Sequence, residues 1–225
     1  MDRVNLIVPT RGRPQKLARM MSSLYPAPKW LRVLVAVDGD LDGFCKDYLG
    51  AGKSPACVPF DWMGSEEHIG AVATRNKAIA TLPRECGGVL YGTDDITFAP
   101  DAIEAAREDF NKAFSDDDGV LGLKQNGTHH PAGVALVGER FLNRYPNRML
   151  FYPGYWHFAC QEIHWLAYKL GRFVCSRREL IKHFHPGTTP GESDTTHVEA
   201  RRRKAQDHAL MNERKQVGKV WGLKQ

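Results

Sequence analysis

Two groups of polar side chains in this sequence have the chemistry of a divalent metal site. Asp94 and Asp95 come directly after the apolar stretch Gly88–Gly92. Adjacent carboxylates repel each other unless a cation lies beside them, and Mg²⁺ and Mn²⁺ both prefer oxygen ligands. His183 and His185 would point to the same side of an extended segment, where an imidazole can complete the shell of Mn²⁺. The alternatives are a solvated turn and a structural histidine pair.

Several arginines could bind phosphate. Arg75 and Asn76 fall in the first turns of a helix expected over Gly70–Ala80, and Arg11 and Arg13 stand in a loop before the first expected helix. A planar guanidinium group matches phosphate oxygens well, and the N-terminus of a helix favours an anion. These residues could therefore hold a diphosphate, although a charged solvent-facing surface would show the same pattern.

Glu162 is a candidate proton acceptor. It stands near the start of a helix expected over Gln161–Leu170, with Trp156 and Phe158 shortly before it. Apolar surroundings would raise the pKa of this carboxyl group, whereas the helix N-terminus would favour the carboxylate. A carboxylate beside aromatic rings suits general-base catalysis on a sugar. The alternative is an exposed glutamate at a helix start.

Alternating strands and helices must position these groups. In the first half of the chain, apolar runs typical of strands alternate with stretches whose apolar residues recur at helical spacing. The expected strands are Val4–Pro9, Leu31–Val37, Ala56–Phe60 and Gly88–Gly92, and the expected helices begin at Pro14, Asp42, Gly70 and Pro100. This pattern predicts an α/β fold with a mostly parallel, twisted sheet flanked by helices.

Polar motifs follow the ends of three of these strands. They are Thr10–Arg13, Asp38–Asp40 and Thr93–Asp95. Ligands of doubly wound sheets bind beyond the carboxyl ends of the strands. We therefore expect one binding site, built at this edge of the sheet from all three motifs.

The second half of the chain is less regular. Strands are expected over Gly119–Leu123 and Val134–Val137, and an extended segment over Glu179–His185. Residues 186–196 are rich in Gly, Pro, Ser and Thr without periodicity, which predicts a flexible lid loop. Thr196-x-x-Glu199 is a capping-box pattern that predicts the start of a last helix. The expected organisation is one catalytic domain over 1–185, with the lid loop and a basic C-terminal helix over 186–225.

The positive charge of the chain is concentrated near its C-terminal end. Residues 172–225 contain 12 Lys and Arg against 6 Asp and Glu, whereas the other residues have a net charge of −1. This excess suits a solvated helical surface, or attraction of an anionic donor or of nucleic acid. The five scattered cysteines include no Cys-x-x-Cys pair, and no apolar run approaches the roughly 20 residues of a membrane span. We therefore expect a cytoplasmic protein without a membrane span.

Together, and in this order, the motifs resemble the nucleotide-sugar-dependent glycosyltransferases of the Rossmann-like GT-A fold, of a small, family-2-like type. The resemblance covers most of the chain. The similar stretches are Val4–Pro14, Val35–Asp40, Gly70–Ile79, Val89–Ile96, Ala159–Glu162 with Leu170–Phe173, and His183–Pro186 with Asp194 and Thr195. Thr93-Asp94-Asp95 lacks the first acid of a strict Asp-x-Asp metal motif, so it is open whether Asp94 binds metal or ribose. Gln161-Glu162 stands where many members have an acidic pair.

The resemblance implies roles for individual residues. Asp95 and His185 would hold Mn²⁺ or Mg²⁺ on the diphosphate, with His183 and Trp156 as additional site residues. Glu162 would take the proton from the acceptor hydroxyl in a single displacement with inversion. A nucleotide-sugar donor would contact Pro9, Thr10, Arg11, Arg13, Asp38, Arg75, Asn76 and Asp94.

Two other functions are compatible with the sequence. A nucleotidyltransferase would share the layout but release pyrophosphate, and the loop after the first strand lacks the dense glycine- and lysine-bearing sequence that would favour it. A non-enzymatic nucleic-acid-binding module would explain the run Arg201–Lys204 but not the ordered acidic and histidine motifs. The basic C-terminal region also suggests, for a transferase, an acceptor hydroxyl on a modified base in DNA.

Overall fold

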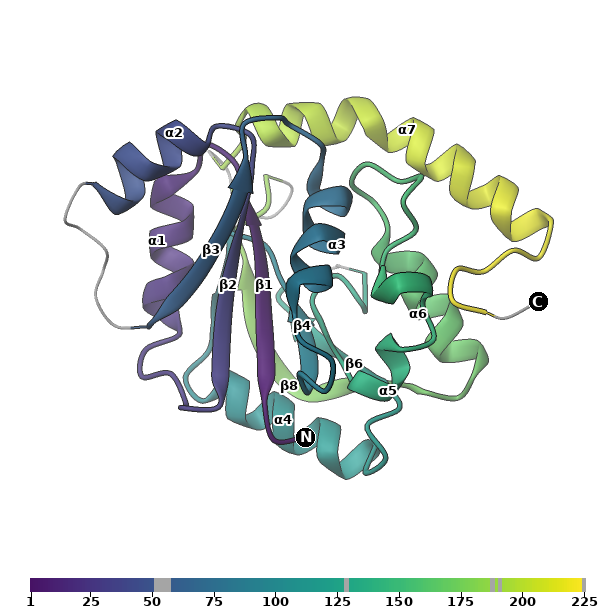
Figure 1. Ribbon diagram of the computed structural model, residues 1–225. Coiled ribbons are helices and arrows are strands. Elements are labelled where there is room, and N and C mark those ends of the chain that lie inside the picture. The colour runs from purple at the N-terminus through teal and green to yellow at the C-terminus, as the bar shows by residue number, and fades with distance from the viewer. Residues whose placement is uncertain (51–57, 128–129, 187–188, 190–191, 224–225) are drawn as a thin grey trace.

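The computed structural model of the protein describes residues 1–225 except 51–57, 128–129, 187–188, 190–191 and 224–225. Its described part forms an eight-stranded sheet with the strand order β3-β2-β1-β4-β7-β6-β8-β5. Helices cover both faces of this sheet, and a long C-terminal helix crosses the molecule at the carboxyl ends of the parallel strands (Figure 1). The predicted α/β architecture is therefore confirmed.

The first half of the chain forms the parallel part of the sheet. Strands β1, β2, β3 and β4 pair in parallel, and the helices between them connect one strand to the next. The elements are β1 (Val4–Thr10), α1 (Pro14–Ser23), β2 (Leu31–Asp38), α2 (Leu41–Phe44), the π-helix η1 (Cys45–Leu49), β3 (Phe60–Ser65), α3 (Ala71–Thr81) and β4 (Gly88–Tyr91). Pro14 starts α1 as expected, because proline suits the first helical turn.

One strand of this half differs from its predicted position. The sequence suggests a strand over Ala56–Phe60, whereas β3 runs over Phe60–Ser65 and residues 51–57 lie outside the described part. The side chains of β3 are mostly half-buried or exposed, because β3 is an edge strand that pairs only with β2 among the described strands. An edge strand has no continuous apolar run, which is the signal that the prediction used.

The second half of the chain makes the sheet mixed. β7 pairs antiparallel with β4 and β6, and β5 pairs antiparallel with β8, whereas β6 and β8 are parallel. The elements are β5 (Ile96–Phe98), α4 (Ala102–Ala113), β6 (Val120–Gln125), β7 (Ala135–Val137), α5 (Glu139–Leu142), the 3-10 helix η2 (Pro146–Arg148), α6 (Cys160–Lys169) and β8 (Phe173–His183). The sheet is thus parallel where the candidate site was expected and mixed beyond β4.

Helix α7 (Thr195–Gln216) begins two residues earlier than its capping-box pattern predicts, because Asp194 and not Thr196 is its N-cap. The carboxylate of Asp194 accepts the backbone N–H of His197 at 3.0 Å, so Asp194 is the N-cap. Glu199 turns away from the helix start and contacts Arg11 instead. None of the described helices, including this one of 22 residues, is long and apolar enough to cross a membrane.

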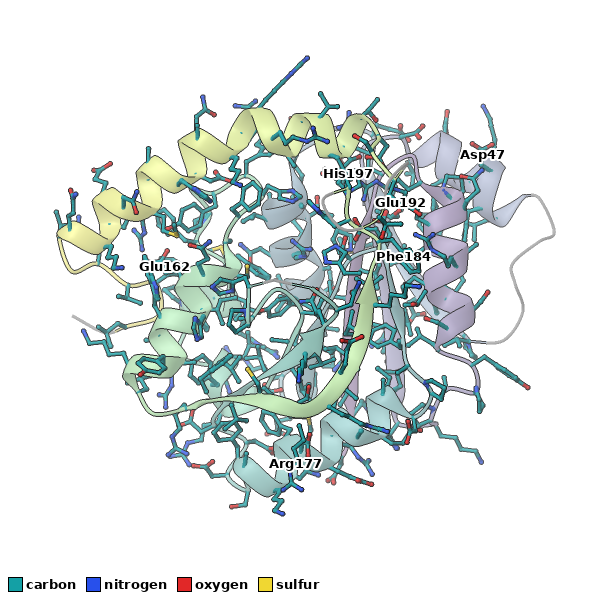
Figure 2. The ribbon with its side chains drawn as sticks, turned by 180° about the vertical axis from the view of Figure 1, so that it is seen from behind. Asp47, Glu162, Arg177, Phe184, Glu192 and His197 are labelled. Carbon is teal, nitrogen blue, oxygen red and sulfur yellow. The ribbon has the colours of Figure 1, made fainter. Side chains whose placement is uncertain are left out.

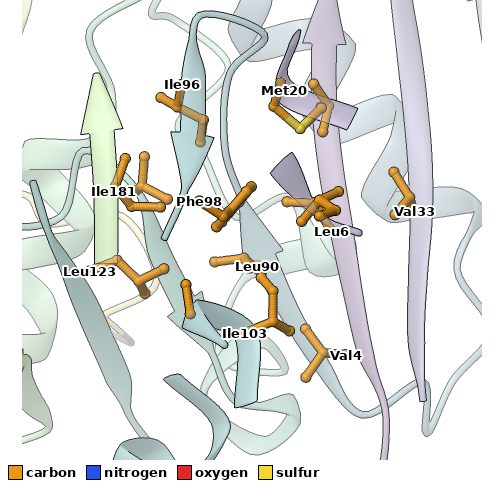
Figure 3. Packing of buried hydrophobic residues seen from close by; sticks show 14 of the residues in the cluster. Val4, Leu6, Met20, Val33, Leu90, Ile96, Phe98, Ile103, Leu123 and Ile181 are labelled. Atoms are coloured by element: carbon orange, nitrogen blue, oxygen red, sulfur yellow. The ribbon is translucent and has the colours of Figure 1, made fainter. Parts of the chain in front are cut away.

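Alternating side chains of the strands build a core on each face of the sheet. Val4, Leu6 and Val8 of β1 pack with residues of α1 and α4, whereas Ile7 faces α3 and α6. Figure 3 shows part of the first cluster, in which Met20 of α1 and Ile103 of α4 meet the strands. Since both faces of β1 are covered, its seven residues are all buried. This rigid centre fixes the strand ends that carry the polar motifs.

Candidate active site

A cavity lies where β1, β2 and β4 end, and the first turns of α7 close it. The residues predicted to bind a donor that line this cavity are Pro9, Thr10, Arg11, Arg13, Asp38, Arg75 and Asp94, and Trp156 lines it as well. Thr196, Glu199 and Ala200 of α7 form the opposite wall. Figure 1 shows α7 crossing this edge of the sheet. The three polar motifs therefore meet at one edge, as parallel strands require.

Asp94 is held by the first loop of the chain. The hydroxyl of Thr10 donates to Oδ2 of Asp94 at 2.8 Å, and Nη1 of Arg13 donates to Oδ1 at 2.8 Å. Burial and the adjacent Asp95 raise the pKa of Asp94, against the opposing effect of Arg13. Burial also opposes the charge of Arg13, but Asp94 and Asp95 raise its pKa above the ordinary value. Arg13 and Asp94 therefore form a buried ion pair at the base of the cavity.

Asp95 is surrounded by imidazole groups. Nε2 of His197 lies 3.1 Å from Oδ2 of Asp95, and Nε2 of His183 lies 3.2 Å from Oδ1. Burial would raise the pKa of Asp95, but hydrogen bonds from His183 and His197 and the charge of Arg13 hold it well below the usual range. The ring of His185 stands 5.6 Å from the rings of both His183 and His197. Asp95 is thus an ionised carboxylate among three histidines.

This group fits a divalent metal in donor chemistry. Carboxylate oxygen and imidazole nitrogen are ligands that Mn²⁺ accepts. Oδ1 of Asp95 is buried, and Nε2 of His183 lies beside it. Among the described residues, no three His, Cys, Asp or Glu side chains surround a common point as a finished metal cage. Nη1 of Arg13, 3.7 Å from Asp95, supplies positive charge there instead.

Charged contacts tie the segment before α7 to helix α1. Asp194 accepts from Nη2 of Arg13 and from Nζ of Lys16, both at 2.8 Å, and Glu192 accepts from Arg19 at 2.9 Å. Figure 2 shows Glu192, Phe184 and His197 close together at this end of the molecule. In the sequence, the predicted lid loop 186–196 separates Phe184 from His197, and its residues 187–188 and 190–191 are outside the described part. The start of α7 is therefore held against the site by ion pairs.

A second series of linked polar and charged side chains spans the cavity from β2 to α7. Nδ1 of His68 lies 2.9 Å from Oδ2 of Asp38, and its Nε2 lies 2.9 Å from Oε2 of Glu199. Nη1 of Arg11 donates to the same oxygen of Glu199 at 2.6 Å. Partial burial opposes the charged form of Glu199, yet His68 and Arg11 lower its pKa. Glu199 is therefore an ionised carboxylate on the cavity wall.

Asp38 also shapes the turn before α3. Its Oδ1 accepts the backbone N–H groups of Ile69 at 2.8 Å and Gly70 at 3.2 Å. Gly70 has a φ of +88°, and a Cβ atom there would lie 2.9 Å from the ring of Trp156. Only glycine suits this position. Asp38 lines the cavity as predicted, but its oxygens are already bonded within the protein.

Arg75 differs from the other cavity arginines because it has no acidic partner. Its Nη2 donates to the carbonyl oxygen of Gly92 at 2.9 Å, and within the described part of the chain no carboxylate lies within ion-pair distance. Its Nε is buried without a hydrogen bond. Burial lowers the pKa of Arg75, opposing its charge. An anion in the cavity would supply the missing partner.

Asn76, the neighbour of Arg75, does not belong to the cavity wall. Its side-chain amide donates to the carbonyl of Phe151 at 2.8 Å and accepts the N–H of Phe151 at 3.1 Å. The side chain is buried and has both halves satisfied. We correct the prediction that it binds the donor: adjacent helical positions point about 100° apart, so Arg75 faces the cavity and Asn76 faces the core.

Glu162 has a structural position rather than that of a base. Its carboxylate is 2% exposed and accepts from Nη2 of Arg214 at 2.7 Å, from the N–H of Trp221 at 2.7 Å and from the hydroxyl of Tyr155 at 2.8 Å. Arg214 and His197 are 17 residues apart on α7, which corresponds to about 25 Å along the helix. Figure 2 shows Glu162 near the opposite end of α7 from His197. The geometry corrects the expectation that Glu162 serves the site at Asp95.

Several residues of the site carry no clear signal in the sequence. His68 stands in a loop, and His197 and Glu199 stand in a polar helix whose buried face is narrow. Each is a single residue whose partner lies far away along the chain, up to 131 residues for His68 and Glu199. The capping-box pattern was the one sign in this region, and it marked the helix start without showing that the helix closes a cavity.

Comparisons with known proteins bear on the fold. The sequence matches no protein-family model and no curated protein. S. aureus TarS 1–349 superposes with a TM-score of 0.59 at 17% identity, over 82% of this chain and 61% of that one. A second structure of S. aureus TarS gives 0.61 at 16% identity, over 80% and 36%. The mannosyltransferase PcManGT from Pyrobaculum calidifontis, in complex with GDP-Man and Mn²⁺, gives 0.47 at 17% identity, over 64% and 48%.

This likeness concerns the architecture. The chain spans less than two thirds of the length of each of these structures, and the identities are low. The superposition on TarS shows a Rossmann-like fold of the GT-A type, as the sequence predicts, and α7 of this chain is the expected helix at its C-terminal end. Function must be argued from the site itself.

Proposed function

We propose that this chain is a glycosyltransferase that binds the diphosphate of a nucleotide-sugar donor in the cavity and transfers the sugar to an acceptor hydroxyl. The observation that carries the proposal is Arg75, a half-buried arginine on the cavity wall whose Nε is buried and which has no acidic partner among the described residues. Arg11 and Arg13 line the same cavity. Guanidinium groups at the carboxyl ends of parallel strands suit the binding of a diphosphate.

Donor entry requires movement of the first turns of α7. The cavity volume open to water is about 50 Å³ with α7 in this position, which holds only a few water molecules. The carboxylate of Glu199 forms an ion pair with Arg11, at the place where an anionic ligand would bind. We propose that the lid of the site includes the start of α7 in addition to the loop 186–196. A lid of this kind also excludes water from the reaction.

We propose Glu199 as the general base in place of Glu162. All three cavity carboxylates have protein partners, but Asp38 and Asp94 are almost fully buried, whereas the side chain of Glu199 is 28% exposed. The acceptor oxygen attacks the anomeric carbon, and the bond from that carbon to the diphosphate oxygen breaks. The hydroxyl proton passes to Glu199, and the electron pair leaves with the nucleoside diphosphate. One displacement gives inversion.

Donor binding would prepare Glu199 for this role. Arg11 and His68 both lower the pKa of Glu199 in the closed, ligand-free arrangement. A diphosphate that takes over Arg11 removes one of these influences. The pKa of Glu199 then rises toward its ordinary value, and the carboxylate becomes a stronger base.

A divalent cation, Mn²⁺ or Mg²⁺, would be held by Asp95 with His185 and His183, and His197 is a further candidate ligand beside the same carboxylate. Such an ion supplies positive charge to stabilise the leaving diphosphate. Asp95 is ionised and surrounded by imidazoles, which supports this assignment.

For the acceptor we propose a hydroxyl group on a modified base in DNA, as the basic C-terminal region suggests.

Thermal-shift measurements with nucleoside diphosphates and nucleotide sugars, with and without Mn²⁺, test the donor site. A ligand at 100 times its Kd stabilises the folded state by about 2.7 kcal/mol. Arg75→Ala should abolish the shift, whereas Lys77→Ala, an exposed position of the same helix, should keep it. No shift for any donor, or an equal shift in both variants, would overturn the assignment. Release of pyrophosphate instead of nucleoside diphosphate would identify a nucleotidyltransferase.

A further inference from the structure

The most basic surface of α7 lies beside the cavity. Arg201, Arg202, Arg203 and Lys204 are four consecutive exposed cations directly after Ala200, which lines the cavity. In the described part of the chain, none of the four lies within ion-pair distance of a carboxylate. The guanidinium groups of Arg201 and Arg203 donate to the neutral side chains of Ser193 and Gln206. We refer to these four residues as the basic turn.

Aromatic rings support two of these cations. The guanidinium of Arg203 stands 4.7 Å from the ring centre of Trp156, and Nζ of Lys204 stands 5.8 Å from that of Phe158. Trp156 itself lines the cavity. The basic turn therefore continues the cavity wall outward, with no intervening acidic side chain among the described residues. A ligand could contact both at once.

The acids of α7 do not neutralise the basic turn. Glu199 is held by Arg11 and His68. Asp207 is buried and accepts the backbone N–H groups of Trp156, His157 and Phe158 at 2.9 to 3.0 Å. Glu213 lies nine residues beyond Lys204, about 14 Å along the helix. The field at the cavity mouth is therefore positive, which attracts a polyanion.

We propose that the basic turn binds the phosphodiester backbone of a single nucleic-acid strand, whose modified base enters the cavity as the acceptor. This inference rests on the proposed function for the acceptor step, but the binding itself needs no donor. Guanidinium groups match phosphate oxygens. Neighbouring positions of a helix point about 100° apart, but all four cations are exposed, so a flexible strand that follows the surface of α7 can contact them with successive phosphates. A base in a duplex must leave its stack to reach a cavity in the protein, so a single strand is the preferred form.

Fluorescence anisotropy with a labelled single-stranded oligodeoxynucleotide of about 16 nucleotides tests the proposal on the full chain without donor. Four phosphate contacts to a single strand correspond to a salt slope of about −2.8, or an affinity loss of about 50-fold between 50 and 200 mM salt. The double variant Arg201→Glu/Arg202→Glu should weaken binding at least tenfold at low salt. The salt slope of this variant should be about half that of the unmodified chain, because two of the four phosphate contacts are lost.

The matched control is Lys29→Glu/Lys112→Glu, which makes the same charge change at exposed positions away from the cavity. It should bind the oligonucleotide like the unmodified chain. Equal weakening in both double variants would overturn the proposal, because it would reflect net charge alone. Tighter binding of anionic phospholipid vesicles or of heparin than of the oligonucleotide would also overturn it.

The thermal shift with nucleoside diphosphate separates this inference from the donor assignment. The Arg201→Glu/Arg202→Glu variant should keep that shift, because neither residue lines the cavity. Loss of nucleic-acid binding with an intact donor shift supports the basic turn as the acceptor surface. A missing donor shift in the unmodified chain, with salt-dependent binding at the basic turn, would overturn the glycosyltransferase assignment and leave the surface in place.

Discussion

Each end of α7 takes part in a glutamate–arginine ion pair. The nitrogen–oxygen distances of the two pairs are almost equal, but the pairs differ in burial and therefore in their expected roles. Glu199 and Arg11 are 2.6 Å apart, with side chains 28% and 36% exposed. Glu162 and Arg214 are 2.7 Å apart, with side chains 3% and 11% exposed, and Arg214 also lies over the ring of Tyr152 at 3.6 Å. Distance does not separate the pairs, but burial does. The exposed pair can exchange partners when a ligand enters, whereas the buried pair must stay together.

The largest effect is expected for catalysis at the cavity end. Glu199→Gln keeps the size of the side chain but cannot accept a proton at neutral pH. Transfer should fall by roughly 10²–10⁴-fold, the usual scale for loss of a general base. Stability should change by less than about 1 kcal/mol, because the pair is partly exposed. Rate measurements beside thermal melts check both expectations, and near-normal transfer would remove Glu199 from the mechanism.

The buried end should respond in the opposite way. Glu162→Gln leaves the guanidinium of Arg214 buried without its counter-charge, which typically costs about 3–5 kcal/mol. Chemical denaturation measures this loss directly. Glu213→Gln, at an exposed position of the same helix, is the control and should be nearly neutral. If the Glu162 variant is as stable as the control but inactive, the original assignment of Glu162 as base returns.

A smaller effect is expected at the N-cap. Asp194→Ala removes the bond to the N–H of His197 and the contacts with Arg13 and Lys16. Loss of an N-cap costs about 0.5–2 kcal/mol. Hydrogen exchange should rise in the first turns of α7 and remain unchanged near Arg214. Thr195→Ala, an exposed neighbour, should leave exchange as it is; uniform change along the helix would show that its two ends are not independent.

The smallest effect concerns acid. The pKa of Glu199 in the folded chain lies below its ordinary value of 4.5. The unfolded chain therefore binds more protons there, and the stabilisation by Glu199 is present above pH 4.5 and lost as pH falls below it. The stability difference between the unmodified chain and Glu199→Gln should shrink in that range. Melting curves from pH 7 to pH 3 test this, and a constant difference would contradict the ion pair.

The fold, and the meeting of the first three polar motifs at one cavity, could be predicted because their signals are local. Continuous apolar runs identify buried parallel strands, and the polar residues after each run, such as Arg13, Asp38 and Asp94, must then meet at one edge. Arg75 lies in the first turns of α3, close to the same strand ends, so its place at the cavity could be predicted in the same way. The edge strand β3 was displaced in the prediction because it lacks such a run.

The surroundings of Glu162 and Glu199 could not be predicted because their partners are distant in the chain. Nothing near Glu162 shows that Arg214, 52 residues later, will neutralise it. The sequence around Glu162 is equally consistent with a catalytic and a structural carboxylate, and the resemblance to a family favoured the first. Likewise, a polar helix gives no sign that Glu199 rather than Glu162 faces the cavity until the path of α7 is known.

The bonds of Asp207 have a consequence for how the cavity opens. Asp207 fixes the middle of α7 to the backbone of three consecutive residues, and Arg214 fixes its far end. Only residues 195–206 can then move away from the cavity, by bending or unwinding within the helix itself. The rate at which ligands enter would depend on the local helix–coil equilibrium of this segment. Exposed positions such as Ala205 would influence turnover through helix propensity alone, without contacting any substrate.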